Sequence, residues 1–252
     1  MTSLEQQIQR AADLVRQATH VVALSGAGIS TPSGIPDFRS PDSGLWDNAD
    51  PMVVASLPAF VRDPQPFYTW FRPLLSTLLA AAPNPAHQAL ADLEAAGKLK
   101  AIVTQNIDDL HRRAGSNTVY ELHGHVREVA CMQCQQIEPA PLVIDQFLQD
   151  GRIPYHHCGG VLKPNVIFFG EMLPRGEYAA SVLALQQADL VLVVGSSLEV
   201  APASELPAVA LDRGAKLVLI NFDPTYLDAK ADVVLHADAA EVLPRLVELA
   251  TA

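Results

Sequence analysis

Cysteine and histidine side chains gather in two short stretches of this sequence and could together bind a metal ion. Cys131 and Cys134 form a C-x-x-C pair, and Cys158 is preceded directly by His156 and His157. Thiolate and imidazole are the usual zinc ligands in proteins, and a structural zinc site takes four of them. The odd number of cysteines favours metal or redox chemistry over a disulfide framework, and the fourth ligand is left open.

A glycine-rich turn that could bind a phosphate follows the first apolar run. The turn reads G-A-G at 26–28 and leads through Ser and Thr to Gly34. Such a turn lets the backbone approach a pyrophosphate, although the usual G-x-G-x-x-G spacing is not met. A plain tight turn would explain the glycines equally well. The next loop combines an acid, an aromatic ring and a guanidinium, which solvent-exposed loops seldom need: Asp37, Phe38 and Arg39.

Polar side chains also follow the apolar run "KAIV". Gln105, Asn106 and Asp108 come at its end, where ligands bind in open α/β sheets. They could hydrogen-bond a ribose or an amide. The alternative is a helix cap, in which Asn106 or Asp108 accepts backbone N–H groups, and for this stretch alone the cap is favoured.

A histidine that could take up a proton near neutral pH follows another short apolar run. It is His123 in the stretch "YELHGHV", and His125 is the competing candidate. A hydrogen-bonded core histidine without a catalytic role is the alternative. Ser196 and Ser197 after "VLVVG", and Asn221 in "LINFD", could contact phosphate or ribose at two further strand ends.

Five apolar runs rich in Val, Ile and Leu supply the strands that would position these side chains. They lack the alternation of a half-buried strand, so they indicate parallel strands covered on both faces. Helical patterns between them predict a doubly wound, Rossmann-like α/β sheet. The expected strands are 20–26, 100–106, 188–197, 216–223 and 231–237, and the expected helices are 87–97, 107–115, 177–188, 204–214 and 239–250.

Two stretches interrupt this alternation and are expected to form a smaller inserted domain. One is rich in Pro, Asp and aromatic residues and holds a single helical run at 66–82. The other contains the cysteines and resembles a small irregular module. The predicted domains are a Rossmann-like domain (1–36, 84–126 and 162–252), a loop and helical module (37–83) and a zinc-binding module (127–161).

The net charge of the 252-residue chain limits the classes of partner that we expect it to bind. A net charge of −11 does not favour nucleic acid or anionic membrane, because phosphate contacts need clustered Lys and Arg, but it tolerates basic peptides. The start reads as an amphipathic helix capped by Ser3 rather than as an export signal. No apolar run reaches the ~18 residues of a membrane span. We therefore expect a cytoplasmic protein, and a monomer.

Taken in order, these motifs resemble those of the sirtuins, the NAD-dependent protein deacylases. The resemblance runs from about Val21 to about Asp238 and rests on "GAGIST", "SGIPDFRS", "TQNIDDLH", "ELHGH", the C-x-x-C pair, "KPNVIFFGE", "GSSLEV" and "INFD". It implies an NAD-dependent protein lysine deacetylase, which transfers the acyl group of a modified lysine to ADP-ribose and releases nicotinamide.

The resemblance also implies a role for each matching residue. His123 matches the general base, a group that typically contributes ~10²–10⁴-fold in rate, and it acts with Asn106 and Asp108 in the catalytic set. Asp108 would hold the nicotinamide carboxamide. The implied NAD-binding residues are Gly26, Ala27, Gly28, Thr31, Asp37, Phe38, Arg39, Gln105, Asn106, Ile107, Asp108, Gly195, Ser196, Ser197, Asn221, Asp223 and Ala237.

In the same family an extended acyl-lysine peptide pairs with strands of both domains. The matching substrate residues are Ile167, Phe168, Phe169, Gly170, Glu171 and Val200. A plain buried strand with two core aromatic residues is the alternative. Succinyl-preferring sirtuins carry Tyr and Arg three apart, whereas Tyr68 and Arg72 here are four apart, so the resemblance favours acetyl.

The family's structural zinc site has two C-x-x-C pairs, and this chain departs from it at the third ligand. Counting back from "GGVLKPN" matches Cys158 to the last ligand and puts Tyr155 at the third. Counting from "IP" puts His156 there. We expect zinc on Cys131, Cys134, His156 and Cys158. His157, next to Cys158, would point away in an extended segment, and a site without metal is the other alternative.

Four other functions compete with the deacetylase. An NAD(P)-linked oxidoreductase would need an acidic residue clearly ending its second strand, which is missing here. A non-catalytic zinc-bearing binding module does not need Asn106, Asp108 and His123 together. Deacylation of other acyl groups, or mono-ADP-ribosylation of proteins, shares the first chemical step and is the nearest alternative.

Overall fold

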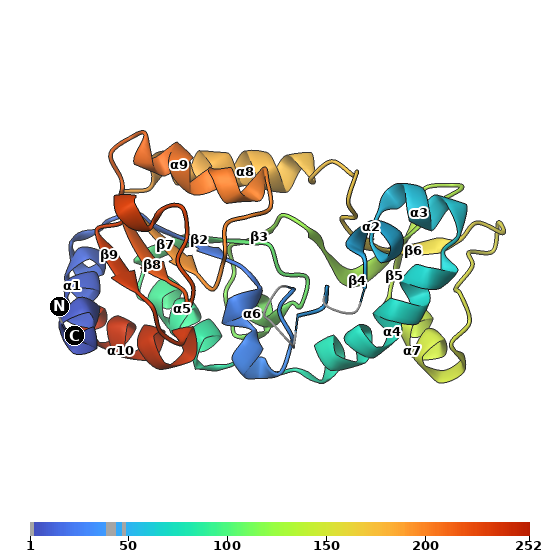
Figure 1. Ribbon diagram of the computed structural model, residues 1–252, viewed down its shortest axis with the longest axis horizontal. Coiled ribbons are helices and arrows are strands. Elements are labelled where there is room, and N and C mark those ends of the chain that lie inside the picture. Colours follow the sequence, from blue (N-terminus) through green and yellow to red (C-terminus); the bar gives the residue numbers. More distant parts are fainter. Residues whose placement is uncertain (1–2, 39–43, 47–48) are drawn as a thin grey trace.

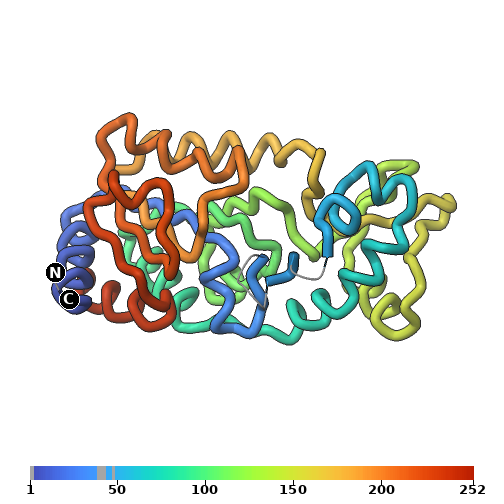
Figure 2. Tube along the Cα trace, in the orientation of Figure 1, coloured from blue at the N-terminus to red at the C-terminus, as the bar shows by residue number. Residues whose placement is uncertain are grey.

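The computed structural model describes residues 3–38, 44–46 and 49–252. Two parts follow one another along the long axis of the molecule: a larger part built on a parallel sheet and a smaller part with an antiparallel sheet and several helices (Figure 1). Both chain ends lie at the far end of the larger part, where α1 (Leu4–Gln17) packs beside α10 (Ala239–Thr251) (Figure 2).

The larger part confirms the predicted Rossmann-like α/β class. Its parallel sheet has six strands within the described residues, and each of the five expected runs forms one of them. The sixth strand is the short apolar run before His123. In spatial order the strands are β3 (Val119–Glu121), β2 (Leu99–Thr104), β1 (Val21–Ser25), β7 (Leu190–Val194), β8 (Lys216–Ile220) and β9 (Val233–Leu235).

Helices cover both faces of this sheet, which explains its continuous apolar strands. Along β1, Val21 and Ala23 face the layer of α1, α5 (Pro85–Ala95) and α10, whereas Val22 and Leu24 face α8 (Arg175–Gln187) and α9 (Leu206–Leu211) (Figure 1). Because successive side chains on a strand alternate between faces, one uninterrupted apolar run fills both layers. The Ser3 cap is confirmed, and it forms a capping box with Gln6.

The strand order places a binding site at one edge of the sheet. Numbered within this sheet alone, the order is 3-2-1-4-5-6, which is the dinucleotide-binding arrangement. Its connections run in opposite directions from β1 and β7, so a crevice opens beyond the carboxyl ends of these two central strands. The expected helix 107–115 is shorter than predicted, since α6 spans only Leu110–Arg113 and Asp109 before it has a φ of 64°.

The smaller part contains more regular structure than its sequence predicts. The expectation of a single helical run and an irregular module is wrong there, because most of its elements are too short to show a period. Within the described residues it holds helices α2 (Pro51–Val54), α3 (Leu57–Arg62), α4 (Gln65–Ala80) and α7 (Pro141–Asp150), and the antiparallel strands β4 (Gly124–Cys131), β5 (Ile137–Pro139) and β6 (Leu162–Val166).

An aromatic core holds the smaller part together. Phe60, Phe67 and Phe168 from α3, α4 and the segment after β6 have ring centroids 4.8–5.4 Å apart. Such edge-on and tilted ring pairs stabilise a core beyond their buried area. The domain limits expected from the sequence stay a prediction. Across the described chain, no helix combines the length and apolar character needed to cross a membrane.

Candidate active site

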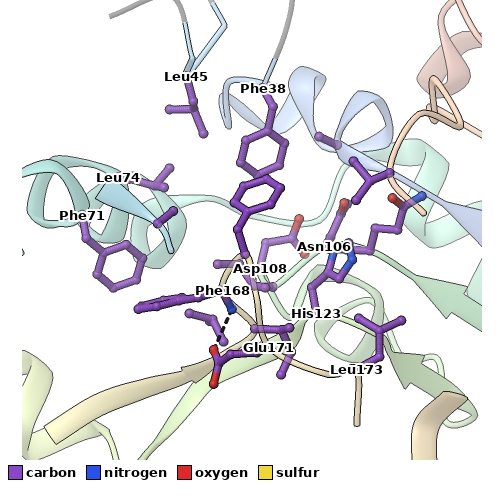
Figure 3. Close-up of a pocket in the computed structure, with 18 of the residues that line it drawn as sticks. Phe38, Leu45, Phe71, Leu74, Asn106, Asp108, His123, Phe168, Glu171 and Leu173 are labelled. Carbon is purple, nitrogen blue, oxygen red and sulfur yellow. Dashed lines mark hydrogen bonds between the residues drawn. The ribbon is translucent and has the colours of Figure 1, made fainter. Parts of the chain in front are cut away.

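A cavity of about 640 Å³ lies between the two parts of the molecule, beyond the carboxyl ends of the central strands. In Figure 3, His123 and Asn106 lie on one side of it and Phe71 and Leu74 on the other. The residues predicted from the sequence that line this cavity are Ala27, Phe38, Gln105, Asn106, Ile107, Asp108, His123, Ile167, Phe168, Phe169, Gly170, Glu171 and Val200.

Most of the other predicted cofactor residues are not among the lining residues and lie around the ends of β1, β7, β8 and β9. There Gln105 donates from Nε2 to Ser196 Oγ at 3.0 Å, and Asn221 donates from Nδ2 to the Asp223 carbonyl at 2.7 Å. Arg39 lies outside the described residues. The residues around these strand ends are Gly26, Gly28, Thr31, Gly195, Ser196, Ser197, Asn221, Asp223 and Ala237, whereas Asp37 lies further along the loop that follows β1.

The glycine turn after β1 packs directly against the turn after β7. A Cβ atom on Gly26 would lie 2.8 Å from the Gly195 carbonyl oxygen, and one on Gly28 would lie 2.9 Å from Gly195 Cα. Gly195 itself has a φ of 58°. The two turns can meet this closely only because Gly26, Gly28 and Gly195 have no side chains, so these glycines build the crevice as well as leaving its backbone open to a phosphate.

Asn106 and Asp108 are joined by a hydroxyl that the sequence analysis missed. Ser30 donates from Oγ to Asp108 Oδ2 at 2.6 Å, and Asn106 donates from Nδ2 to Ser30 Oγ at 3.1 Å. Burial raises the pKa of Asp108 above its usual range. Asp108 also accepts the Leu110 N–H at 2.9 Å, so the cap interpretation of this segment holds as well. The only signal for Ser30 was its place inside the glycine turn.

His123 lies half-buried at the cavity wall with one ring nitrogen engaged. Its Nδ1 atom is 3.0 Å from the carbonyl oxygen of Gln105, and burial lowers its pKa below the usual value. The competing candidate, His125, is not among the described lining residues; its Nε2 atom lies 3.8 Å from a carboxylate oxygen of Glu128. Of the two histidines, His123 is the one placed to exchange a proton with a ligand.

Two tryptophans that the sequence did not assign to the site, Trp46 and Trp70, form an apolar wall with the predicted residues Phe38 and Phe169. Trp46 stacks on Phe38 at 5.2 Å and on Trp70 at 5.4 Å between ring centroids, and it lies 6.3 Å from Phe169. All four line the cavity. The aromatic run at 66–82 was visible in the sequence, but which of its faces meets the cavity depends on how α4 packs.

The segment after β6 is held in one shape by a partly buried ion pair. Lys163 Nζ lies 2.9 Å from Glu171 Oε2 and 4.2 Å from the Phe168 ring centroid, and Glu171 accepts the Phe168 N–H at 2.7 Å (Figure 3). Phe168 is buried, whereas 37% of Phe169 is exposed. The alternative of two core aromatic residues therefore fits only Phe168.

The four predicted metal ligands converge at the far end of the smaller part. Cys158 Sγ lies 3.5 Å from Cys131 Sγ, and His156 Nδ1 lies 3.0 Å from Cys158 Sγ and 3.4 Å from Cys134 Sγ. All four ligand atoms lie within 4.8 Å of one another, so the cluster can hold a zinc ion. The Cys134 N–H lowers the pKa of Cys131 to about 7, which favours the thiolate that zinc binds.

The second ring nitrogen of His156 faces a carboxylate. Nε2 is buried and lies 3.3 Å from Glu138 Oε1, in contact but not aligned as a hydrogen bond. A carboxylate at this position is typical of histidines that bind zinc through their other nitrogen. Glu138, His156 and His157 also form a group of possible ligands, but this group lacks the sulfur donors of the first.

Comparisons with known proteins identify the family. The Sir2 family model matches residues 26–202. The chain belongs to the Sir2 family. An NAD-dependent protein deacetylase of Sulfurisphaera tokodaii is 43% identical, covering 94% of this chain and 93% of its own. The enzyme class predicted from the sequence, an NAD-dependent protein deacetylase, is thereby confirmed.

Solved structures of Sir2 proteins share the whole fold of this family member. One, from work on the mechanism and regulation of Sir2 enzymes, has a TM-score of 0.92 at 42% identity and covers 98% of both chains. Another, a Sir2 protein bound to a myristoylated histone peptide, has a TM-score of 0.84 at 37% identity and covers 98% of this chain and 97% of its own.

Proposed function

We propose that this Sir2 protein deacetylates lysine side chains of proteins, using NAD as a co-substrate. The observation that carries the proposal is the meeting of His123, Asn106 and Asp108 at the wall of the cavity, beyond the carboxyl ends of parallel strands in the dinucleotide-binding order. A buried amide and a buried carboxylate suit a carboxamide, and a nearby imidazole suits a proton transfer.

Each side chain has a task in this proposal. NAD, when bound, supplies the ADP-ribosyl group that accepts the acetyl group, with nicotinamide as the leaving group. Asp108 and Asn106, fixed by Ser30, bind the nicotinamide carboxamide. His123 accepts a proton from a ribose hydroxyl through Nε2, because the Gln105 carbonyl occupies Nδ1. Phe38 and Trp46 exclude water from the reacting atoms.

The peptide binds where the two parts of the molecule face each other. Ile167 from the smaller part and Val200 from the larger part both line the cavity. The backbone of Phe169 pairs with α2 and α3 through Ala55 and Leu57, at 2.9 and 3.0 Å. This isolated bridge fixes the segment at the cavity wall, and a peptide bound beside it would direct its acyl-lysine into the cavity.

The part of the cavity near Phe71 and Leu74 suits an uncharged acyl group. Neither Tyr68 nor Arg72 is among the described lining residues: Tyr68 donates to the Leu162 carbonyl, and Arg72 donates to the Leu148 carbonyl at 2.5 Å. A succinyl or malonyl carboxylate in the cavity would therefore have neither the charge of Arg72 nor the hydroxyl of Tyr68 as a binding partner. The wall near Phe71 and Leu74 is apolar, so acetyl is favoured over acidic acyl groups.

Zinc has a structural role in this proposal. Its ligands would be Cys131, Cys134, Cys158 and Nδ1 of His156, a closed set of four without an open position for catalysis. Zinc there would tie the turn after β4 to the turn before β6. A monomeric state, a cytoplasmic location and the lack of nucleic-acid and membrane partners stay predictions from the sequence.

A panel of acyl-peptides tests the proposal. Acetyl-, succinyl- and myristoyl-lysine peptides of one sequence are incubated with NAD, and peptide, nicotinamide and acyl-ADP-ribose are measured by mass. We expect acetyl-ADP-ribose to form in step with deacetylated peptide, and acetyl to be removed faster than succinyl. ADP-ribose attached to protein at comparable rates would favour mono-ADP-ribosylation, and a change in NADH absorbance would favour an oxidoreductase.

A further inference from the structure

One guanidinium joins two carboxylates that come from different segments of the active site. Arg127 on β4 donates from Nη1 to Glu121 Oε1 at 2.8 Å and from Nη2 to Glu121 Oε2 at 2.5 Å. The same Nη1 also pairs with Asp109. A planar guanidinium that binds one carboxylate through both nitrogens fixes orientation as well as distance.

Each of these carboxylates stands close in sequence to a residue of the reaction. Asp109 directly follows Asp108, and Glu121 lies two residues before His123. The chain from Glu121 to Arg127 therefore forms a loop that carries His123 and is closed by an ion pair. The contact between His123 Nδ1 and the Gln105 carbonyl is one link between the two segments, and Arg127 supplies a second.

Asp109 sits in a backbone conformation that needs such a partner. Its φ of 64° and ψ of 7° lie in the left-handed region, which is strained for a residue other than glycine. Glu121 also needs compensation, because only 7% of its side chain is exposed. Arg112 stands 3.8 Å away from Glu121 and is a weaker partner than Arg127. Removing Arg127 would leave Asp109 without its partner and Glu121 without its main partner at the same time.

We propose that Arg127 is a positioning residue for the deacetylation reaction, which sets the place of His123 relative to Asn106 and Asp108. Arg127 is not among the described lining residues of the cavity, so it acts through Asp109 and Glu121 rather than on a substrate. The inference rests on the proposed function. The two halves of the reaction should respond differently to the loss of Arg127. Nicotinamide release uses Asn106 and Asp108, whereas the later proton transfer uses His123.

The test compares two rates in each variant: exchange of labelled nicotinamide into NAD in the presence of acetyl-peptide, and net deacetylation. In Arg127→Met we expect deacetylation to fall about 10-fold or more and exchange to fall much less, since a misplacement of about 1 Å can cost 10²-fold. Arg127→Lys, which keeps the charge but not the planar fork, should recover part of the loss. Asp109→Gly removes one carboxylate without adding backbone strain. It should also lower the ratio of the deacetylation rate to the exchange rate.

Arg245→Met is the matched control. Arg245 also contacts two carboxylates, Glu5 at 3.4 Å and Glu248 at 2.7 Å, but on α10 at the far end of the molecule. Its loss should leave both rates within about twofold of the wild type.

A purely structural role of Arg127 would lower both rates by the same factor, because unfolded protein performs neither reaction. An unchanged ratio in Arg127→Met would therefore overturn the proposal, as would a deacetylation rate within twofold of the wild type. If Arg127→Met does not fold, the ratio of deacetylation to exchange in Arg127→Lys and Asp109→Gly tests the proposal instead. A wild-type protein that performs neither reaction would instead contradict the proposed function.

Discussion

The Nδ1 atom of His123 lies 3.0 Å from the backbone carbonyl oxygen of Gln105. A carbonyl oxygen can only accept a hydrogen bond, so Nδ1 carries the hydrogen and Nε2 is left free to take up a proton. The same segment that provides this carbonyl continues into Asn106 and Asp108. One backbone contact therefore sets the tautomer of the proposed base and ties it to the proposed nicotinamide pocket.

The pH dependence of deacetylation follows from this placement. Burial lowers the pKa of His123 below 6.5, and the base acts only in its neutral form. We expect kcat/KM to stay level as the pH is lowered to about 6.5, and to fall only at lower pH as His123 is protonated. The measurement is a profile of kcat/KM from about pH 5 to 9, corrected for unfolding. A fall that begins well above pH 7 would contradict this assignment.

Replacement of the base should separate chemistry from binding. We expect His123→Ala to abolish deacetylation while the fold and NAD binding stay largely intact, because within the described residues the ring makes one hydrogen bond to the scaffold. The paired control is His125→Ala, which alters a histidine outside the cavity wall and should keep most of the activity. Turnover is measured with an acetyl-peptide, and NAD binding by calorimetry. Near-normal turnover of His123→Ala would sink the mechanism.

Two glycine-to-alanine exchanges should have opposite effects on stability. At Gly195, φ is +58° and a Cβ would lie 2.2 Å from the backbone nitrogen of Ile29, so Gly195→Ala should destabilise the protein by about 3 kcal/mol or more. At Gly176 in α8, no atom lies within 4 Å of an added Cβ, so Gly176→Ala should stabilise it by up to about 1 kcal/mol. Urea unfolding of both variants checks the pair, and equal stabilities would refute the close packing of the two turns.

Much of this arrangement could be read from the sequence because its signals are local. Buried parallel strands have a continuous apolar composition, and polar side chains after five of them belong to one edge of one sheet. Asn106, Asp108 and His123 became candidates in this way, and the family resemblance then gave them their roles. The cluster of Cys131, Cys134, His156 and Cys158 was found from ligand chemistry and spacing together with the family resemblance.

The features that were missed depend on contacts between distant segments. Ser30 matters because Asp108, on another strand end, accepts its hydrogen bond. Trp46 and Trp70 meet only after α4 has packed against the loop after β1. Asp109 reads as part of a helix, yet it takes a left-handed conformation in which it pairs with Arg127 on β4. Side-chain contacts between distant segments produce no periodic pattern in the sequence of either segment.

Buried histidines should make the protein sensitive to mild acid. Burial lowers the pKa of His87 from 6.5 to about 4, and burial lowers that of His111 as well. Between about pH 6.5 and 4 the unfolded chain then binds more protons than the folded one, so stability is complete above about pH 6.5 and is lost as the pH falls. His87 alone accounts for on the order of 3 kcal/mol. The free energy of unfolding at several pH values, compared with His87→Gln, should show a shallower slope in the variant; parallel slopes would rule out this origin.

The metal content of purified variants tests whether His156 or His157 is the fourth zinc ligand. His156 is buried with Nδ1 facing two cysteine sulfurs, whereas His157 is exposed and its ring lies tilted by 47° against the His156 ring, with centroids 3.7 Å apart. We expect about one zinc per chain in the purified protein, loss of zinc in His156→Ala and Cys134→Ala, and retention in His157→Ala. Since zinc binding is coupled to folding of the cluster, the variants that lose zinc should also melt at a lower temperature.

Replacement of the metal by cobalt adds a test that does not depend on activity. A Co²⁺ ion bound by three thiolates and one imidazole should show sulfur-to-metal charge-transfer absorption, which should disappear in Cys134→Ala and stay unchanged in His157→Ala. Zinc well below one per chain in a protein that is still folded would mean that packing alone holds the turn of β4 against residues 156–158. Loss of zinc in His157→Ala, but not in His156→Ala, would assign the fourth ligand to the exposed ring instead.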